Sequence, residues 1–111
     1  MARASLELLQ GTLDILVLKA LSWGPRHGYA VAAWIRDTTV DGLNVEDGAL
    51  YTALHRMEQR RWLEAEWGLT ENNRKAKFYQ LTEAGRAELR RARGRWAAYA
   101  LAVSRVLEAR A

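Results

Sequence analysis

The sequence contains no cysteine, only one proline and no long apolar run, and each absence excludes a class of protein. Without cysteine, the 111 residues can form neither a disulfide framework nor a cysteine-based zinc site or thiol nucleophile. The most apolar stretch, LDILVLKALSW, carries Asp14 and Lys19 and is well short of the roughly 20 residues that a membrane span requires. Acidic residues interrupt the N-terminal apolar stretch and no small-residue cleavage site follows it, so we predict no signal peptide and a cytoplasmic protein.

The sequence also lacks the usual signals of an active site. No serine stands in a nucleophile-elbow pattern, no glycine-rich phosphate loop is present, and Glu64 and Glu66 alternate on a predicted strand without sign of a cleft. The only histidines, His27 and His55, have no carboxylate at ligand spacing. We therefore expect no enzyme, no metal and no cofactor. A net charge of +4 and a pI near 9.9 instead favour an anionic partner, either nucleic acid or a membrane surface.

Apolar residues at three- and four-residue spacing predict three helices in the first half of the chain. The first helix, which includes Leu9 and Leu13, is apolar on both sides, so we expect another subunit to cover its second side. The turn SWGPRHG, with the single proline, separates it from a second helix at about residues 29–38. The third helix follows Asp47 as its N-cap. Its buried stripe is predicted at Leu50, Ala53, Leu54 and Met57.

After the third helix, the period of the apolar residues changes to two, which is typical of strands. Apolar residues alternate with Glu64 and Glu66 in the first run and with Ala76, Phe78 and Gln80 in the second. The polar stretch GLTENNRK separates the two runs, so the sequence predicts a β-hairpin. The inward positions of the hairpin are Leu63, Ala65, Trp67, Lys77, Tyr79 and Leu81. Trp67, like Trp34 in the second helix, is therefore predicted to lie in the core.

The last helix, with Thr82 as its predicted N-cap, carries a heptad pattern. From Thr82 to Arg110 it would be about 43 Å long at 1.5 Å per residue. A chain of this size has a radius of gyration of about 13 Å, so such a helix would project from the body and need a partner. We expect a second copy of the chain to cover it, together with Leu9 and Leu13 of the first helix. The predicted seam of the dimer consists of Leu89, Ala92, Trp96, Tyr99, Val103 and Val106.

Three helices followed by a hairpin predict a mostly α protein with a winged helix-turn-helix fold and a long C-terminal dimerisation helix. We place the winged-helix DNA-binding domain at residues 1–81 and the dimerisation helix at residues 82–111. In this fold the third helix enters the DNA major groove and the hairpin loop contacts the backbone. The DNA-binding residues predicted on these two elements are Gly48, Tyr51, Thr52, His55 and Arg56 on the helix, and Arg74, Lys75 and Lys77 at the hairpin tip. Winged helices also serve as protein–protein interaction modules without DNA binding, and this alternative stays open.

Four segments of the sequence resemble the PadR family of bacterial transcriptional regulators, in its short form with a single C-terminal helix. The segments are LLQGTLDILVLKAL, HGYAVAAWI, GALYTALHRMEQRRWLEAEW and RKAKFYQLTEAGRAEL, and together they cover most of residues 8–90. The family pattern GxLYxxLxRLE matches from Gly48 onward, and the pattern YxLTxxG matches from Tyr79 to Gly85. The resemblance implies a homodimeric repressor that binds a palindromic operator in double-stranded DNA and is released by a small, often aromatic, effector.

The same resemblance assigns roles to individual residues. It implies that Tyr51 and its neighbours contact the operator, and that Arg74 and Lys75 lie in the wing. Trp96 matches a position that lines a hydrophobic pore for planar ligands in some members, with Tyr99 one turn further along. The sequence departs from the family where Glu46 and Asp47 replace a common Ser-Pro pair. It departs again at Arg61, where glycine is usual, so Arg61 must adopt a positive φ or the third helix must end differently.

Overall fold

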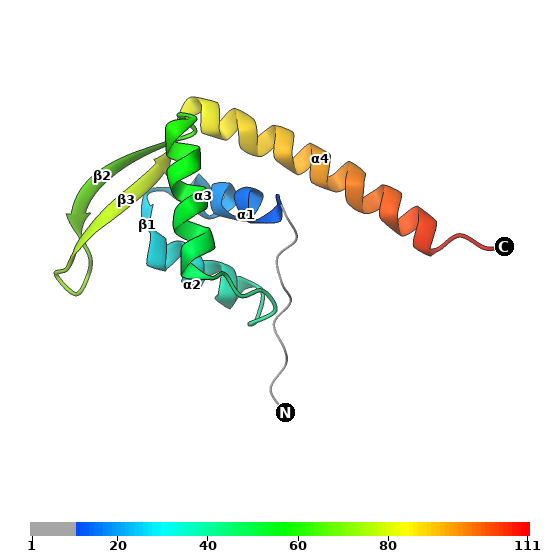
Figure 1. Ribbon diagram of the computed structural model, residues 1–111, viewed down its shortest axis with the longest axis horizontal. Helices are drawn as coiled ribbons and strands as arrows, with labels where there is room; N and C mark the ends of the chain where they lie inside the picture. The colour runs from blue at the N-terminus through cyan, green and yellow to red at the C-terminus, as the bar shows by residue number, and fades with distance from the viewer. Residues whose placement is uncertain (1–10) are drawn as a thin grey trace.

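The computed structural model describes residues 11–111, which form four α-helices and a small sheet at one side of them (Figure 1). Leu9, predicted to lie in the dimer interface, falls outside the described residues. In chain order the elements are α1 (Thr12–Ala20), the 3-10 turn η1 (Leu21–Trp23), β1 (Arg26–His27), α2 (Gly28–Thr38), α3 (Asp47–Gln59), β2 (Leu63–Leu69), β3 (Lys75–Leu81) and α4 (Glu83–Leu107). Among these helices, none is long and apolar enough to cross a membrane. The predicted mostly α architecture with a β-hairpin is confirmed.

The core lies between α1, α2, α3 and the base of the sheet. Its largest fully buried side chains come from α1 and η1, from α2 and from α3, and include Leu18, Leu21, Ile35, Leu54 and Met57. Leu63 and Leu81 close it from the two strands of the hairpin. The stripe predicted on α3 is buried throughout, which confirms its inward face and leaves the opposite face of α3 to solvent.

Helix starts follow the local chemistry of the sequence, with one correction. The Thr82 hydroxyl accepts a 3.0 Å hydrogen bond from Gly85 N–H, so the predicted N-cap of α4 is confirmed. His27 caps α2 in the same way, because its Nδ1 accepts from the N–H of Ala30 at 3.3 Å. The prediction of Asp47 as the N-cap of α3 is wrong. Glu46 occupies that position without a side-chain capping bond, and Asp47 lies in the first turn, where the helix dipole favours an acid.

The end of α3 shows how the chain accommodates Arg61, at the position where the family resemblance implies glycine. Arg61 adopts a φ of +63°. Its N–H donates to the carbonyl of Glu58 at 3.0 Å, and the N–H of Trp62 donates to the carbonyl of Met57 at 3.0 Å. This pair of bonds is a Schellman motif, which ends a helix through one left-handed residue. Arg61 therefore adopts a strained left-handed backbone conformation, and the chain turns directly from α3 into β2.

The sheet contains a third strand that the sequence analysis did not predict. The strand β1 is antiparallel to β3, with Arg26 opposite Tyr79 and His27 opposite Phe78, so the strand order is β1-β3-β2. A two-residue strand is too short to show an alternating pattern of apolar residues. Pro25 and the flanking glycines instead predicted a turn at this place. Through β1, the start of α2 is hydrogen-bonded to the base of the hairpin.

The inward side of the hairpin runs from the core into solvent, which corrects the prediction for Trp67. Leu63 is buried and Ala65 is half-buried, but Trp67 is 62% exposed because the hairpin extends past the helices. Trp34 is half-buried against the core, as predicted. The hairpin β2–β3, residues 63–81, thus has a core-facing base and a free outer half, and it is called the wing below.

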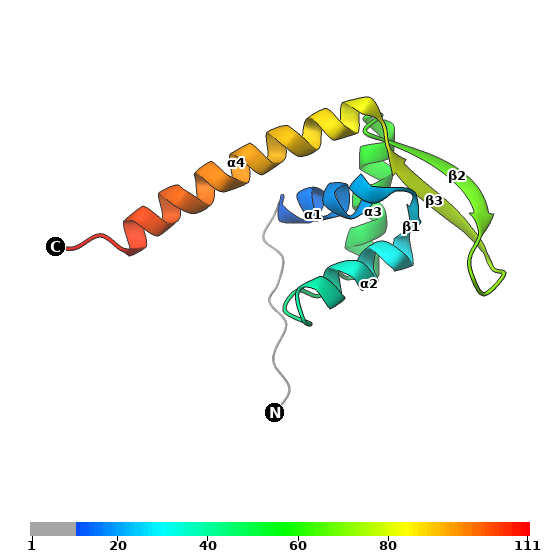
Figure 2. The same ribbon diagram turned by 180° about the vertical axis from the view of Figure 1, so that it is seen from behind.

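The long helix α4 also leaves the body of the protein. Figures 1 and 2 show α4 extending away from the other helices on the side opposite the wing. The molecule measures 59 × 40 × 22 Å and its radius of gyration is 15.8 Å, against about 13 Å for a compact chain of this length. Only Gly85, Glu88 and Leu89, in its first two turns, are buried.

The start of α4 crosses the end of α3 so closely that only glycine fits at position 85. A Cβ on Gly85 would lie deep inside van der Waals contact of the Trp62 carbonyl oxygen and 3.0 Å from the Trp62 carbonyl carbon. The same carbonyl oxygen accepts hydrogen bonds from the Thr82 N–H at 3.0 Å and from the Thr82 hydroxyl at 3.1 Å. Backbone, rather than a flexible side chain, therefore occupies the space that a larger residue would need.

We expect Gly85→Ala to lower the free energy of unfolding by about 2 kcal/mol, because either α4 or the Trp62 backbone must move. Gly94→Ala is the matched control, since nothing lies within 4 Å of a Cβ placed there. This control should raise stability by about 0.5–1 kcal/mol through its helix propensity. Urea unfolding at equal protein concentration measures both, and an unchanged midpoint for Gly85→Ala would contradict the account of this crossing.

Candidate nucleic-acid interface

The outward face of α3 presents polar side chains on a rigid helix. Gly48, Thr52 and His55 are exposed, and Tyr51 is 50% exposed. Nothing lies within 4 Å of a Cβ placed on Gly48, so the start of α3 is open on this side. These residues lie opposite the buried stripe, as predicted from the sequence. A face of this kind can offer hydrogen bonds from hydroxyl and imidazole groups without disturbing the core.

The ring of Tyr51 packs against Gly28 on the neighbouring helix α2. A Cβ on Gly28 would lie 2.8 Å from Cε1 and 2.9 Å from the hydroxyl oxygen of Tyr51, so the absent side chain makes room for the ring. Tyr29, the residue after Gly28, is exposed and stacks on His27 at 6.3 Å between ring centroids. The sequence analysis gave Tyr29 no role in the predicted interface.

Arg56 does not lie on the free outward face where the sequence analysis placed it. Its guanidinium group forms an ion pair with the carboxylate of Asp14 on α1, and both side chains are partly buried. Five residues separate Arg56 from Tyr51, which turns it about 140° around the helix axis and toward α1. The structure therefore gives Arg56 a positioning contact between α3 and α1.

The tip of the wing carries the exposed cations that the sequence predicts. Thr70 N–H donates to the carbonyl of Arg74 at 2.8 Å, and Asn73 takes a φ of +62° to close the turn. Arg74 and Lys75 follow this turn and are exposed. Two exposed cations at a projecting tip form a positive group that phosphates can approach.

Lys77 lies in β3 and not at the tip, which corrects its predicted place. Its ammonium group donates a 2.9 Å hydrogen bond to Oε1 of Glu58 on α3. This hydrogen bond is the main cause that raises the pKa of Lys77 above its ordinary value. The ammonium also lies 5.5 Å from the ring centroid of Tyr79, whose own pKa is raised by burial. Lys77 thus connects the wing to the end of α3.

The two faces of the wing differ in charge. The inner face, which continues the core-facing side toward α3, carries Trp67 opposite Lys77 and Leu69 opposite Lys75. The outer face carries Glu64 opposite Gln80 and Glu66 opposite Phe78. An anionic partner is attracted to the inner face and tip and repelled by the outer face. The arrangement therefore allows only one side of the wing to meet a phosphate backbone.

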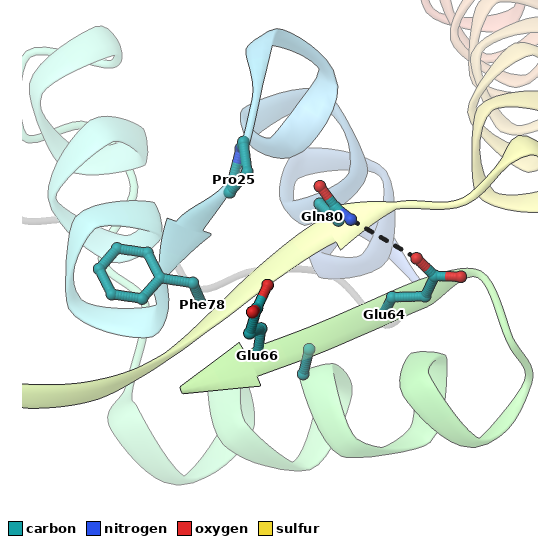
Figure 3. A pocket seen from close by; sticks show the side chains of 6 residues that line it. Pro25, Glu64, Glu66, Phe78 and Gln80 are labelled. Atoms are coloured by element: carbon teal, nitrogen blue, oxygen red, sulfur yellow. Dashed lines mark hydrogen bonds between the residues drawn. The ribbon is translucent and has the colours of Figure 1, made fainter. Parts of the chain in front are cut away.

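Figure 3 shows the outer face, where a shallow pocket lies between β1 and the wing. Glu64 and Glu66 line it with Pro25, Phe78 and Gln80, and the Gln80 amide donates to Glu64 at 3.5 Å. Two carboxylates without a third ligand make a poor metal site, and residues 11–111 contain no group of three or more side chains suited to hold a metal ion. The pocket is best described as the acidic back of the wing.

The predicted seam on α4 is exposed over most of its length. Leu89 is the exception, because its own chain buries it against the core. Leu13 on α1 is half-buried against the same core. Beyond Leu89 the chain supplies little cover: Ala92 is half-buried and the remaining seam residues, Trp96, Tyr99, Val103 and Val106, are exposed. The rings of Trp96 and Tyr99 lie 6.1 Å apart between centroids, one above the other on the helix.

The sequence and fold match known proteins over most of the chain. Residues 17–91 match the Transcriptional regulator PadR-like family. The structure of a PadR family transcriptional regulator from Eggerthella lenta is 31% identical with a TM-score of 0.78, over 91% of this chain and 86% of that one. An uncharacterized protein X of Lysinibacillus sphaericus is 28% identical over 82% of this chain and 84% of its own length. An uncharacterized 37.1 kDa protein in transposon TN4556 of Streptomyces fradiae is 43% identical over 70% of this chain, which spans only 21% of that protein.

Proposed function

Because the chain belongs to the PadR-like family of transcriptional regulators, we propose that it is a dimeric repressor that a small aromatic or hydrophobic effector releases from a palindromic DNA site. The family match confirms the resemblance seen in the sequence and makes the protein a DNA-binding regulator of transcription rather than an enzyme. The single observation that carries the proposal is that two exposed surfaces adjoin. Lys77 on the basic inner face of the wing binds Glu58 at 2.9 Å, and Glu58 lies seven residues, or about two turns, after Tyr51 on the polar face of α3. The acidic back of the wing lies on the opposite face of the same strands.

In the proposed complex, α3 lies in the major groove. Tyr51, Thr52 and His55 reach base edges or phosphates from its exposed face, and Gly48 lets the start of the helix approach the backbone. Glu46 and Asp47 stand at the same end of α3 and repel phosphates. We therefore propose that the middle of α3 makes the closest contact with DNA and that its first turn stays further from the backbone.

The cations divide into two groups in this proposal. Arg74 and Lys75, exposed at the wing tip, contact phosphates directly. Arg56 and Lys77 are engaged by Asp14 and Glu58, so they act first by holding α3 against α1 and against the wing. Their charge still adds to the positive field of the interface, but it is partly compensated by the two carboxylates.

The uncovered seam supports dimerisation through α4. Trp96, Tyr99, Val103 and Val106 expose apolar area along one line of a helix that projects from the body. A second copy of α4, or α1 of the second copy, would remove this area from water. We keep the division at residue 82 between the DNA-binding and dimerisation parts, with the first two turns of α4 fastened to the DNA-binding part through Leu89.

The aromatic pair on α4 supports an effector site at the dimer centre. Trp96 and Tyr99 together present two broad rings on the seam, and two copies of this pair would line a space that a planar guest can fill. An effector that binds there favours one arrangement of the two subunits, and so alters the spacing of the two α3 helices.

We expect Tyr51→Ala to weaken binding to a duplex selected from a random pool by roughly tenfold, while thermal stability stays nearly unchanged because Tyr51 is 50% exposed. Tyr51→Phe is the matched control, since it keeps the ring against Gly28 and removes only the hydroxyl. Fluorescence anisotropy over a salt series measures both, and wild-type affinity should fall steeply with salt. If the wild-type protein shows no salt-sensitive binding to any duplex, the chain acts as a protein-interaction module and the proposal fails.

Val103→Lys should shift the protein from dimer to monomer at micromolar concentration, because it places a charge in the proposed apolar seam. Leu101→Lys is the control, since Leu101 is an exposed apolar residue of α4 outside the seam and should leave the dimer intact. Sedimentation equilibrium gives the masses. A well-folded wild-type monomer under these conditions would contradict the proposed dimer.

Planar aromatic compounds should quench tryptophan fluorescence of the wild-type protein saturably, and Trp96→Ala should abolish this saturable part. Trp23→Ala removes a different exposed tryptophan and should retain it. The bound compound should also reduce DNA binding of the wild-type protein in the same titration. Equal quenching of Trp96→Ala and the wild type would place the binding site elsewhere in the molecule.

A further inference from the structure

Trp67, the most exposed aromatic residue of the wing, has no role in the proposed function. Trp67 is 62% exposed, and Leu69, two residues further along β2, is equally open. Most of the surface of both side chains is therefore in water, which costs free energy that burial against a partner would recover. Two exposed apolar side chains do not stabilise the folded chain, so we look for their role in what the wing contacts.

The direction of Trp67 follows from the strand register. Trp67 stands opposite Lys77, and the two side chains share a face of the sheet because cross-strand partners point the same way. Lys77 reaches Glu58 at the end of α3 at 2.9 Å, so this face is the one turned toward α3. Trp67 therefore lies on the inner face of the wing, on the side of the proposed DNA surface and not on the acidic back.

The charges around Trp67 identify the chemistry of its partner. The ammonium of Lys75 lies 5.4 Å from the ring centroid, and Arg74 is exposed beside it. The opposite face of the same strands carries Glu64 and Glu66. A surface that alternates apolar and cationic groups complements the sugar–phosphate strand of duplex DNA, where deoxyribose faces alternate with phosphates. An acidic or purely apolar protein surface would match only one of the two components.

We propose that Trp67, with Leu69, packs against deoxyribose rings of the DNA strand that borders the groove occupied by α3, while Lys75 contacts the adjoining phosphate. The proposal rests on the proposed function and adds an uncharged contact to it. Such a contact releases no counterions, so it contributes affinity that does not depend on salt, in contrast to the contribution of Lys75. Trp67 also extends the footprint of each subunit beyond the major groove.

The test compares salt dependences on one duplex selected from a random pool with the wild-type protein. Trp67→Ala should weaken binding by roughly tenfold at every salt concentration and leave the slope of log K against log salt unchanged. Trp67→Phe should recover most of the affinity. Lys75→Ala should lower the slope by about one. Thermal melts of all variants verify that the wing is folded.

Trp23→Ala is the matched control, because Trp23 is 61% exposed and also has a cation over its ring, Lys19 at 4.4 Å, but lies in η1 outside the wing. It should bind like the wild type. Unchanged affinity of Trp67→Ala, with salt-sensitive binding by the wild type, would overturn the inference and leave the proposed function standing. A reduced salt slope for Trp67→Ala would also overturn it, since the ring would then act only by placing Lys75. Loss of binding by the wild type itself would instead refute the proposed function.

Discussion

The carbonyl oxygen of Trp62 is the point at which the functional parts of this protein are joined. It accepts hydrogen bonds from the N–H and the hydroxyl of Thr82, and Gly85 passes directly over it without a side chain. The Schellman motif at Arg61 aims the chain toward this point at the end of α3. As a result, the end of α3, the first strand of the wing and the start of the long helix are held together by backbone contacts. No flexible linker separates the start of α4 from the end of α3 at this point.

Two ion pairs hold α3 along its sides. Arg56 is paired with Asp14 on α1, and Lys77 of the wing is paired with Glu58. Both ion pairs are partly exposed, so each contributes little to stability. Their main effect is to fix how α1 and the wing are oriented against α3. They also withdraw two cations from direct phosphate contact. In the proposed complex, the exposed cations that remain near the interface are Arg74 and Lys75 at the wing tip, so the difference in charge between the two faces of the wing determines which face meets the phosphates.

The wing and the long helix share one physical feature, since each carries apolar side chains that its own chain leaves uncovered. On α4 these are the seam residues beyond Leu89, and on the wing they are Trp67 and Leu69. Both elements project from the core, so the side chains at their far ends cannot be covered within one subunit. In the proposed assembly a second subunit covers the first set and DNA covers the second. In this proposed assembly, the surfaces for the two partners lie on opposite sides of α3 (Figure 1).

The sequence by itself determined the elements, because helix and strand periods, caps and turns depend on residues that are near neighbours in the chain. It predicted the buried stripe of α3, the N-cap at Thr82, the hairpin and the positive φ or altered helix end at Arg61, and the structure shows each of them. It failed where the outcome depends on distant residues. Arg56 and Asp14 are 42 positions apart, Lys77 and Glu58 are 19 apart, and β1 is a strand only because β3 lies beside it. Whether Trp67 is covered depends on where the helices end relative to the wing, and only the tertiary structure decides that distance.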